Sequence, residues 1–154
     1  MVSPDINGIY APDNHPANSW APGTNLQFAA QGAAVPAFNV SVLAPAPAPI
    51  TSPPNGPLTI NRAAGITFAW SATQAATVNV ELIDQSNVGL VACSFNGGAG
   101  MGFVPPAMLS GFVSGQAGVA DVYTVEVNTV QAGAWAVQAV GLDLSYENTA
   151  VTFQ

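Results

Sequence analysis

Short runs in which apolar and polar residues alternate recur along most of the chain, and they predict β-strands. Val78, Val80 and Leu82 alternate with Asn79 and Glu81, which is the two-residue period of a strand with one buried face. Comparable runs predict about nine strands, with two in residues 26–43 and one each near 58–60, 66–70, 78–82, 88–95, 123–127, 135–137 and 151–153. Gly, Asn and Pro close most of these runs, as expected for turns.

One stretch breaks the strand pattern and predicts a short helical turn. Residues 104–112 read VPPAMLSGF, where Pro106 suits the first turn of a helix and Gly111 suits its end. No long amphipathic helix separates the predicted strands, and strands spaced by about ten residues are typical of sandwiches. We therefore expect an all-β, antiparallel, Ig-like sandwich with Greek-key connections.

Proline divides the chain into an arm, a body and one candidate internal boundary. Residues 1–23 hold four prolines and three asparagines, and we interpret them as an extended N-terminal arm. Residues 24–154 are expected to form a single β-sandwich domain. Within it, residues 44–57 hold six prolines, which cannot donate to a strand ladder, so this stretch is either an edge crossing or a linker.

Several segments together resemble a known group of proteins. ITFAWSATQAATVNVELIDQ, followed by VACSF, VPPAML and AGAWAVQAV, is similar to bacterial secreted and lipoprotein-anchored Ig-like β-sandwich proteins, over roughly residues 35–154. The resemblance implies this fold and a location outside the cell or on its surface. The group has no settled activity, so the resemblance implies no catalytic residue. Residues 1–23 show no export signal, and the extracellular location is therefore an expectation from the resemblance.

The scarcity of charge excludes two classes of partner. Charged residues make up 6% of the chain, against about a quarter in ordinary domains. Arg62 is the only basic residue beside eight acidic ones, which gives a net charge of −7. Binding to phosphate backbones or anionic lipid needs clustered cations, so neither nucleic acid nor a membrane surface is an expected partner. No apolar run approaches the ~20 residues of a membrane helix.

The residues that carry most enzyme chemistry are scarce. His15 is the only histidine and lies in the proline-rich arm, so a Ser-His-Asp or Cys-His arrangement has little to build on. The carboxylates Glu81 with Asp84, and Asp143 with Glu147, are expected at solvated strand ends rather than as an acid–base pair. We therefore expect a protein that is not an enzyme.

Calcium is the one metal that the composition favours, because calcium binds carboxylate and carbonyl oxygens. Asp5 and Asn7 match the opening of a calcium loop, although no glutamate follows at the far end. Asp13 is a further candidate ligand that equally suits a turn. Zinc is excluded by the single histidine and single cysteine. No cofactor other than calcium is expected.

The large aromatic residues fall into two groups. Trp70 and Trp135 are in phase with apolar strand positions, and we expect both in the core. Tyr10, Trp20 and Tyr146 lie in predicted arm or loop segments. Exposed aromatic rings there suit stacking on a sugar or docking on a neighbouring protein.

Two functions remain open at this point. In the first, the chain is a structural subunit that assembles with copies of itself or other surface proteins into a filament, layer or shell. Its arm then adds a strand to a neighbour's sheet, anchored by Ile6, Ile9 and Tyr10. In the second, the domain binds a glycan or another ligand at the cell surface, with Trp20 and Tyr146 as the stacking residues.

Overall fold

Most of the described chain forms β-strands. We use a computed structural model, which describes residues 20–73, 77–85 and 89–154, with the backbone alone at residues 146–148. The strands are β1 (Asn25–Ala30), β2 (Phe38–Leu43), β3 (Ile50–Ser52), β4 (Leu58–Ile60), β5 (Ile66–Trp70), β6 (Thr77–Asp84), β7 (Leu90–Asn96), β8 (Met101–Val104), β9 (Ala117–Ala132) and β10 (Trp135–Phe153). A 3₁₀ turn, η1 (Gly97–Ala99), and a short helix, α1 (Pro106–Leu109), complete it. The all-β prediction is confirmed.

Two of the three sheets enclose the main core. One has the strand order β4-β10-β9-β6-β7, and the other has the order β3-β5-β8. Val78, Val80 and Leu82 of β6 are all 0% exposed, and they share a core cluster with Phe68 and Trp70 of β5. The alternation that predicts β6 therefore also identifies its buried face.

The short helix predicted within residues 104–112 is confirmed as α1. Pro106 occupies its first turn, and Leu109 is fully buried. Just beyond α1, the ring of Phe112 stacks on the ring of Phe153 with centroids 4.0 Å apart. The helix and the segment after it thus pack against the end of β10.

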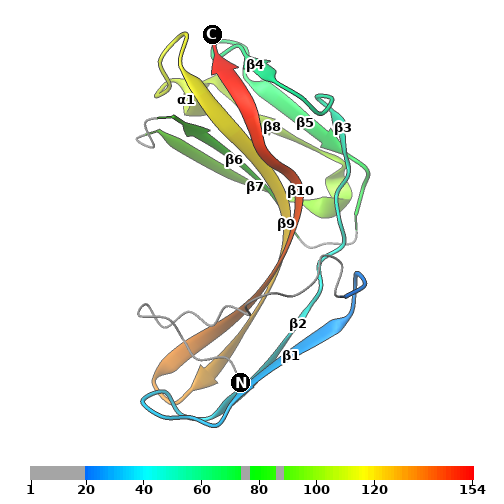
Figure 1. The fold of residues 1–154 in the computed structure, drawn as a ribbon, viewed down its shortest axis with the longest axis vertical. Coiled ribbons are helices and arrows are strands. Elements are labelled where there is room, and N and C mark those ends of the chain that lie inside the picture. Colours follow the sequence, from blue (N-terminus) through cyan, green and yellow to red (C-terminus); the bar gives the residue numbers. More distant parts are fainter. Residues whose placement is uncertain (1–19, 74–76, 86–88) are drawn as a thin grey trace.

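The hairpin of β9 and β10 is longer than the two-sheet part of the molecule. Figure 1 shows both strands running on to the opposite end, where β1 and β2 lie. β6 pairs with β9 only as far as Val125. We call residues 125–144, where β9 and β10 continue as a pair, the ribbon. A second, smaller core lies between the ribbon and the sheet of β1 and β2, and it contains Val40, Val42 and Ala139.

Two features set the geometry where the ribbon meets the rest of the fold. The pairing of β10 with β9 shifts register between Leu144 and Tyr146 and again before Thr149, and such bulges bend a strand and increase its twist. At Gly141, an added Cβ would lie 2.9 Å from Cδ of Pro45. The missing side chain therefore allows the end of the β1–β2 sheet to approach the ribbon closely.

The structure differs from the expected strand pattern in three ways. The strands predicted near 135–137 and 151–153 are parts of the single strand β10. β3 and β8 were not predicted, because one lies in the proline-rich stretch 44–57 and the other follows a run of glycines. β4 pairs with β10 in parallel, so the sheets are not wholly antiparallel.

Candidate assembly surface

One face of the ribbon exposes a group of apolar side chains. Val127 lies opposite Val140, and Val125 lies opposite Leu142. Cross-strand partners point to the same face, and alternate residues along a strand share that face. Val127, Val140, Leu142 and Leu144 are 53%, 48%, 56% and 55% exposed. We call Val125, Val127, Val140, Leu142 and Leu144 the ribbon face.

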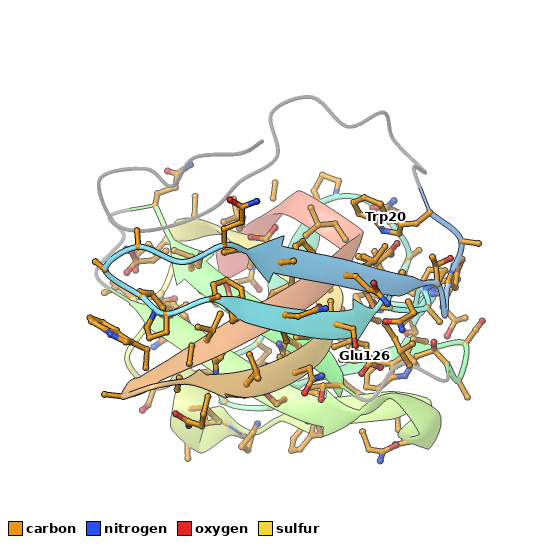
Figure 2. The ribbon with its side chains drawn as sticks, turned by 90° about the horizontal axis from the view of Figure 1, so that it is seen from below. Trp20 and Glu126 are labelled. Atoms are coloured by element: carbon orange, nitrogen blue, oxygen red, sulfur yellow. The ribbon has the colours of Figure 1, made fainter. Side chains whose placement is uncertain are left out.

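The opposite face of the ribbon is covered by the β1–β2 sheet. Figure 2 views the molecule from this end and shows the two strand pairs stacked face to face. Ala139 is 6% exposed in the second core, and Asn128 donates a hydrogen bond to the carbonyl oxygen of Ser41 on β2 at 2.7 Å. In the described part of the chain, no third layer packs on the ribbon face.

The ribbon face contains no charged residue. Glu126 and Asp143 belong to the ribbon, but they alternate with the ribbon face and point to the side of the β1–β2 sheet, where Gly141 lies opposite Glu126. Partial burial there raises the pKa of the Asp143 carboxyl above its usual value. The two acids therefore leave the apolar surface uninterrupted.

A tyrosine borders the ribbon face at its junction with the two-sheet part. Tyr123 lies opposite Leu144, and its hydroxyl donates a hydrogen bond to a carboxylate oxygen of Glu81 on β6. Burial, followed by this hydrogen bond and the charge of Glu81, raises the pKa of Tyr123 to about 12. The hydrogen-bonded pair of Tyr123 and Glu81 marks where the apolar ribbon face ends.

Trp135 corrects an expectation from the sequence, whereas Trp70 confirms one. Trp70 is 3% exposed in the main core, but Trp135 is 55% exposed. Trp135 does alternate correctly with the covered residue Ala139, yet it is the first residue of β10, at the tip of the hairpin. At the hairpin tip, a residue on the same face as buried residues is therefore not itself buried.

The other predicted site residues are only partly placed. Trp20 is 38% exposed and precedes β1 (Figure 2). Tyr146 lies within β10, not in a loop as expected, and its side chain is outside the described part. The predicted arm anchors and calcium ligands all lie outside the described residues: Ile6, Ile9, Tyr10, Asp5, Asn7 and Asp13.

One carboxylate of the sequence analysis, Asp84, has surroundings different from those expected. Asp84 was predicted at a solvated strand end, but it is 5% exposed and accepts a hydrogen bond from the backbone N–H of Gly89 at 3.0 Å. It closes the connection between β6 and β7. Within the described residues, His, Cys, Asp and Glu side chains form no group of three or more that could hold a metal ion.

The single basic side chain of the chain lines a shallow pocket of about 540 Å³ beside α1. Nη1 of Arg62 donates a hydrogen bond to the carbonyl oxygen of Phe112 at 2.6 Å. Asn61, Ser110 and Gln154 supply the other polar groups of the lining. Arg62 thus ties the start of the β4–β5 connection to the segment after α1.

Comparison with known proteins adds no relative to these observations. No protein-family model matches the sequence, and neither the curated proteins nor the solved structures contain a match. Within the described residues, no helix has the length and apolar character needed to cross a membrane.

Proposed function

We propose that this chain is a non-enzymatic, extracellular structural protein that assembles with copies of itself. The observation that carries the proposal is the ribbon face, an exposed apolar surface without charge on a two-stranded part of the fold. Covering such a surface removes apolar area from water and desolvates no ion. The location outside the cell is supported by the sequence resemblance.

The energy available from the ribbon face sets the strength of the contact. Full burial of a Val or Leu side chain contributes about 1.5–3 kcal/mol, so covering four half-exposed ones contributes roughly 3–6 kcal/mol. Association costs about 4–15 kcal/mol in lost freedom of motion. The ribbon face alone therefore supports weak association, and a stable assembly needs a further contact, which the N-terminal arm is suited to supply.

We also propose that the two-sheet part is Ig-like. In Ig domains, strands C, F and G form one sheet and A, B and E lie in the other, with C′ added in variable domains. Assigning β6, β7, β9 and β10 to C, C′, F and G, and β3, β5 and β8 to A, B and E, reproduces this division. The lone Cys93 lies on β7, so the B–F disulfide of antibody domains has no counterpart.

A second function has one observation in its favour. Trp20 and Trp135 are 38% and 55% exposed, and exposed indole rings suit stacking on sugars. Under this alternative, the domain is a glycan-binding module at the cell surface. A glycan array should then return a ligand whose binding is lost in Trp20→Ala or Trp135→Ala, and an array without binding would remove the alternative.

Light scattering over a range of concentrations tests the proposed self-assembly. Leu142→Asp places a charge at the centre of the ribbon face and should raise the concentration needed for assembly by at least about tenfold, which corresponds to about 1.4 kcal/mol. Leu90→Asp is the matched control, because Leu90 is 63% exposed on β7, two strands away from the ribbon strand β9. A chain that stays monomeric at all concentrations would refute the proposal.

A further inference from the structure

The side of β10 that faces away from β9 is the longest strand edge without a partner strand among the described residues. On that side β10 pairs only with β4, and only through Val151–Phe153. Residues 135–150 of β10 therefore present backbone N–H and C=O groups to no other strand of the described chain. Such an edge is a template for an added strand.

This edge lacks the features that usually prevent strand addition. Proteins protect edges with charged side chains, prolines or bulges. Residues 135–142 of β10 read WAVQAVGL, with no charged residue and no proline, and the register shifts of β10 begin only after Leu144. We call residues 135–142 of this side the open edge.

The N-terminal arm joins the described fold near the middle of β10, on the face that the β1–β2 sheet covers. The backbone N–H of Gly23 donates to the carbonyl oxygen of Ala44 at 2.8 Å. The neighbouring carbonyl oxygen, that of Leu43, would lie 3.0 Å from a Cβ built at Gly141 of β10. Trp20 therefore lies three residues before Gly23, which is bonded to a segment close to the middle of β10. Residues 1–19 precede it.

The length of the arm favours a partner edge on another molecule. Tyr10 precedes Trp20 by ten residues, and ten residues in an extended, proline-containing segment would span about 30 Å. Toward the hairpin tip, the open edge extends six residues from Gly141 to Trp135, a length of only about 20 Å. In the other direction, the open edge ends at Leu142, the residue after Gly141. Ten extended residues would therefore span more than the open edge of the same chain.

We propose that residues 5–11 of one copy add to the open edge of β10 in a second copy as an extra strand. This inference rests on the proposed self-assembly, and it names the donor and the acceptor. Residues 5–11 read DINGIYA, the longest proline-free part of the arm before Trp20. Backbone hydrogen bonds along the edge provide the second contact that the ribbon face alone lacks.

The side chains of the donated segment fit the two sides of the open edge. In a strand, Ile6 and Tyr10 point to one face and Ile9 points to the other. In one orientation, Ile6 and Tyr10 widen the ribbon face beside Leu142. Ile9 then lies on the side of the β1–β2 sheet, next to the second core of Val40, Val42 and Ala139. Both faces of the added strand thereby cover apolar surface.

Cross-linking between full-length chains tests this pairing. Every chain carries Cys93→Ala, which removes the only native thiol. A Tyr10→Cys chain is mixed with chains carrying Val140→Cys, Leu142→Cys or Leu144→Cys, which sample neighbouring registers, and is oxidised gently. A disulfide forms only where the two Cα atoms come within about 4.4–6.8 Å. Leu90→Cys, on β7, is the matched control, and light scattering of each mixture records assembly.

The expected result is a disulfide between the two kinds of chain at one of the three β10 positions, at least about tenfold above the Leu90→Cys control. Assembly without such a disulfide would overturn strand donation while leaving self-assembly in place. Absence of assembly in the parent Cys93→Ala chain would overturn both. A chain carrying Tyr10→Cys and Leu142→Cys that links only within itself would place the arm on its own edge and also overturn donation to a neighbour.

Discussion

Substitution of two adjacent ribbon residues by aspartate should affect two different properties of the protein, the fold in one case and assembly in the other. Ala139 is 6% exposed under the β1–β2 sheet, whereas Val140 points to the ribbon face and is 48% exposed. Aspartate placed at either position adds one negative charge to the same strand. Because the two side chains point to opposite faces, Ala139→Asp should damage the fold and Val140→Asp should damage assembly.

The size of each effect follows from what surrounds the residue. Ala139 packs with Val40 and Val42, and an unpaired charge in such a place costs about 3–5 kcal/mol. The second core is separate from the main core, so the loss should appear as local opening of the β1–β2 sheet. At Val140 the free energy of unfolding should change by about 1 kcal/mol or less, the range of strand propensity.

Hydrogen exchange and urea denaturation of the two variants separate these effects. In Ala139→Asp, the amides of β1 and β2 should lose protection while those of β6 keep it. In Val140→Asp, protection should be unchanged and the concentration for assembly should rise at least about tenfold. If both variants lost the same stability, or if Val140→Asp opened the β1–β2 sheet, the assignment of the two ribbon faces would be wrong.

Further predictions concern charge, hydrogen bonding and close packing. Copies with a net charge of −7 repel each other, so assembly should strengthen as salt screens that repulsion; weakening measured by light scattering would contradict an apolar contact. Burial raises the pKa of Asp143, so its ionised form opposes folding above that pKa; Asp143→Asn should raise the melting temperature at pH 7, and the gain should disappear near pH 3, where the carboxyl is protonated in both states. In an absorbance titration, the Tyr123 hydroxyl should ionise with a pKa of about 12. Glu81→Gln should lower this pKa because it removes the negative charge beside the hydroxyl. Gly141→Ala should cost about 1–3 kcal/mol by overpacking, whereas Gly111→Ala, where a Cβ meets nothing within 4 Å, should leave the free energy of unfolding nearly unchanged.

The sequence predicts local strands well where one face is buried along the whole run. β6 and β5 follow their alternation because every second residue enters the main core. The same reasoning fails at Trp135, whose phase is right but whose face is no longer covered at the hairpin tip. Alternation reports which residues share a face, and it does not report how far the covering layer extends.

For a related reason, the alternation of residues in the sequence could not predict the candidate assembly surface. Val140, Leu142 and Leu144 alternate with Gly141 and Asp143, which by itself predicts that the apolar set is buried. The structure instead places the apolar set outside, because the β1–β2 sheet packs on the side of Ala139 and Gly141. Only the tertiary position of that sheet distinguishes the two arrangements.

The polarity of the ribbon changes along its exposed side, and this locates the expected contact between copies. Gln138 and Thr129 lie opposite each other one step nearer the hairpin tip, on the same side as Val140 and Val127. Polar residues are therefore compatible with this side of the ribbon, and the fold does not require apolar ones next to them. Apolar side chains stabilise a fold only when they are removed from water, so the uncovered apolar side chains of the ribbon face give the isolated chain no folding advantage. The apolar half also adjoins the position where the N-terminal arm enters the fold. We therefore expect copies to meet at the half of the ribbon nearer the two-sheet part, where the ribbon face lies, and not at the hairpin tip.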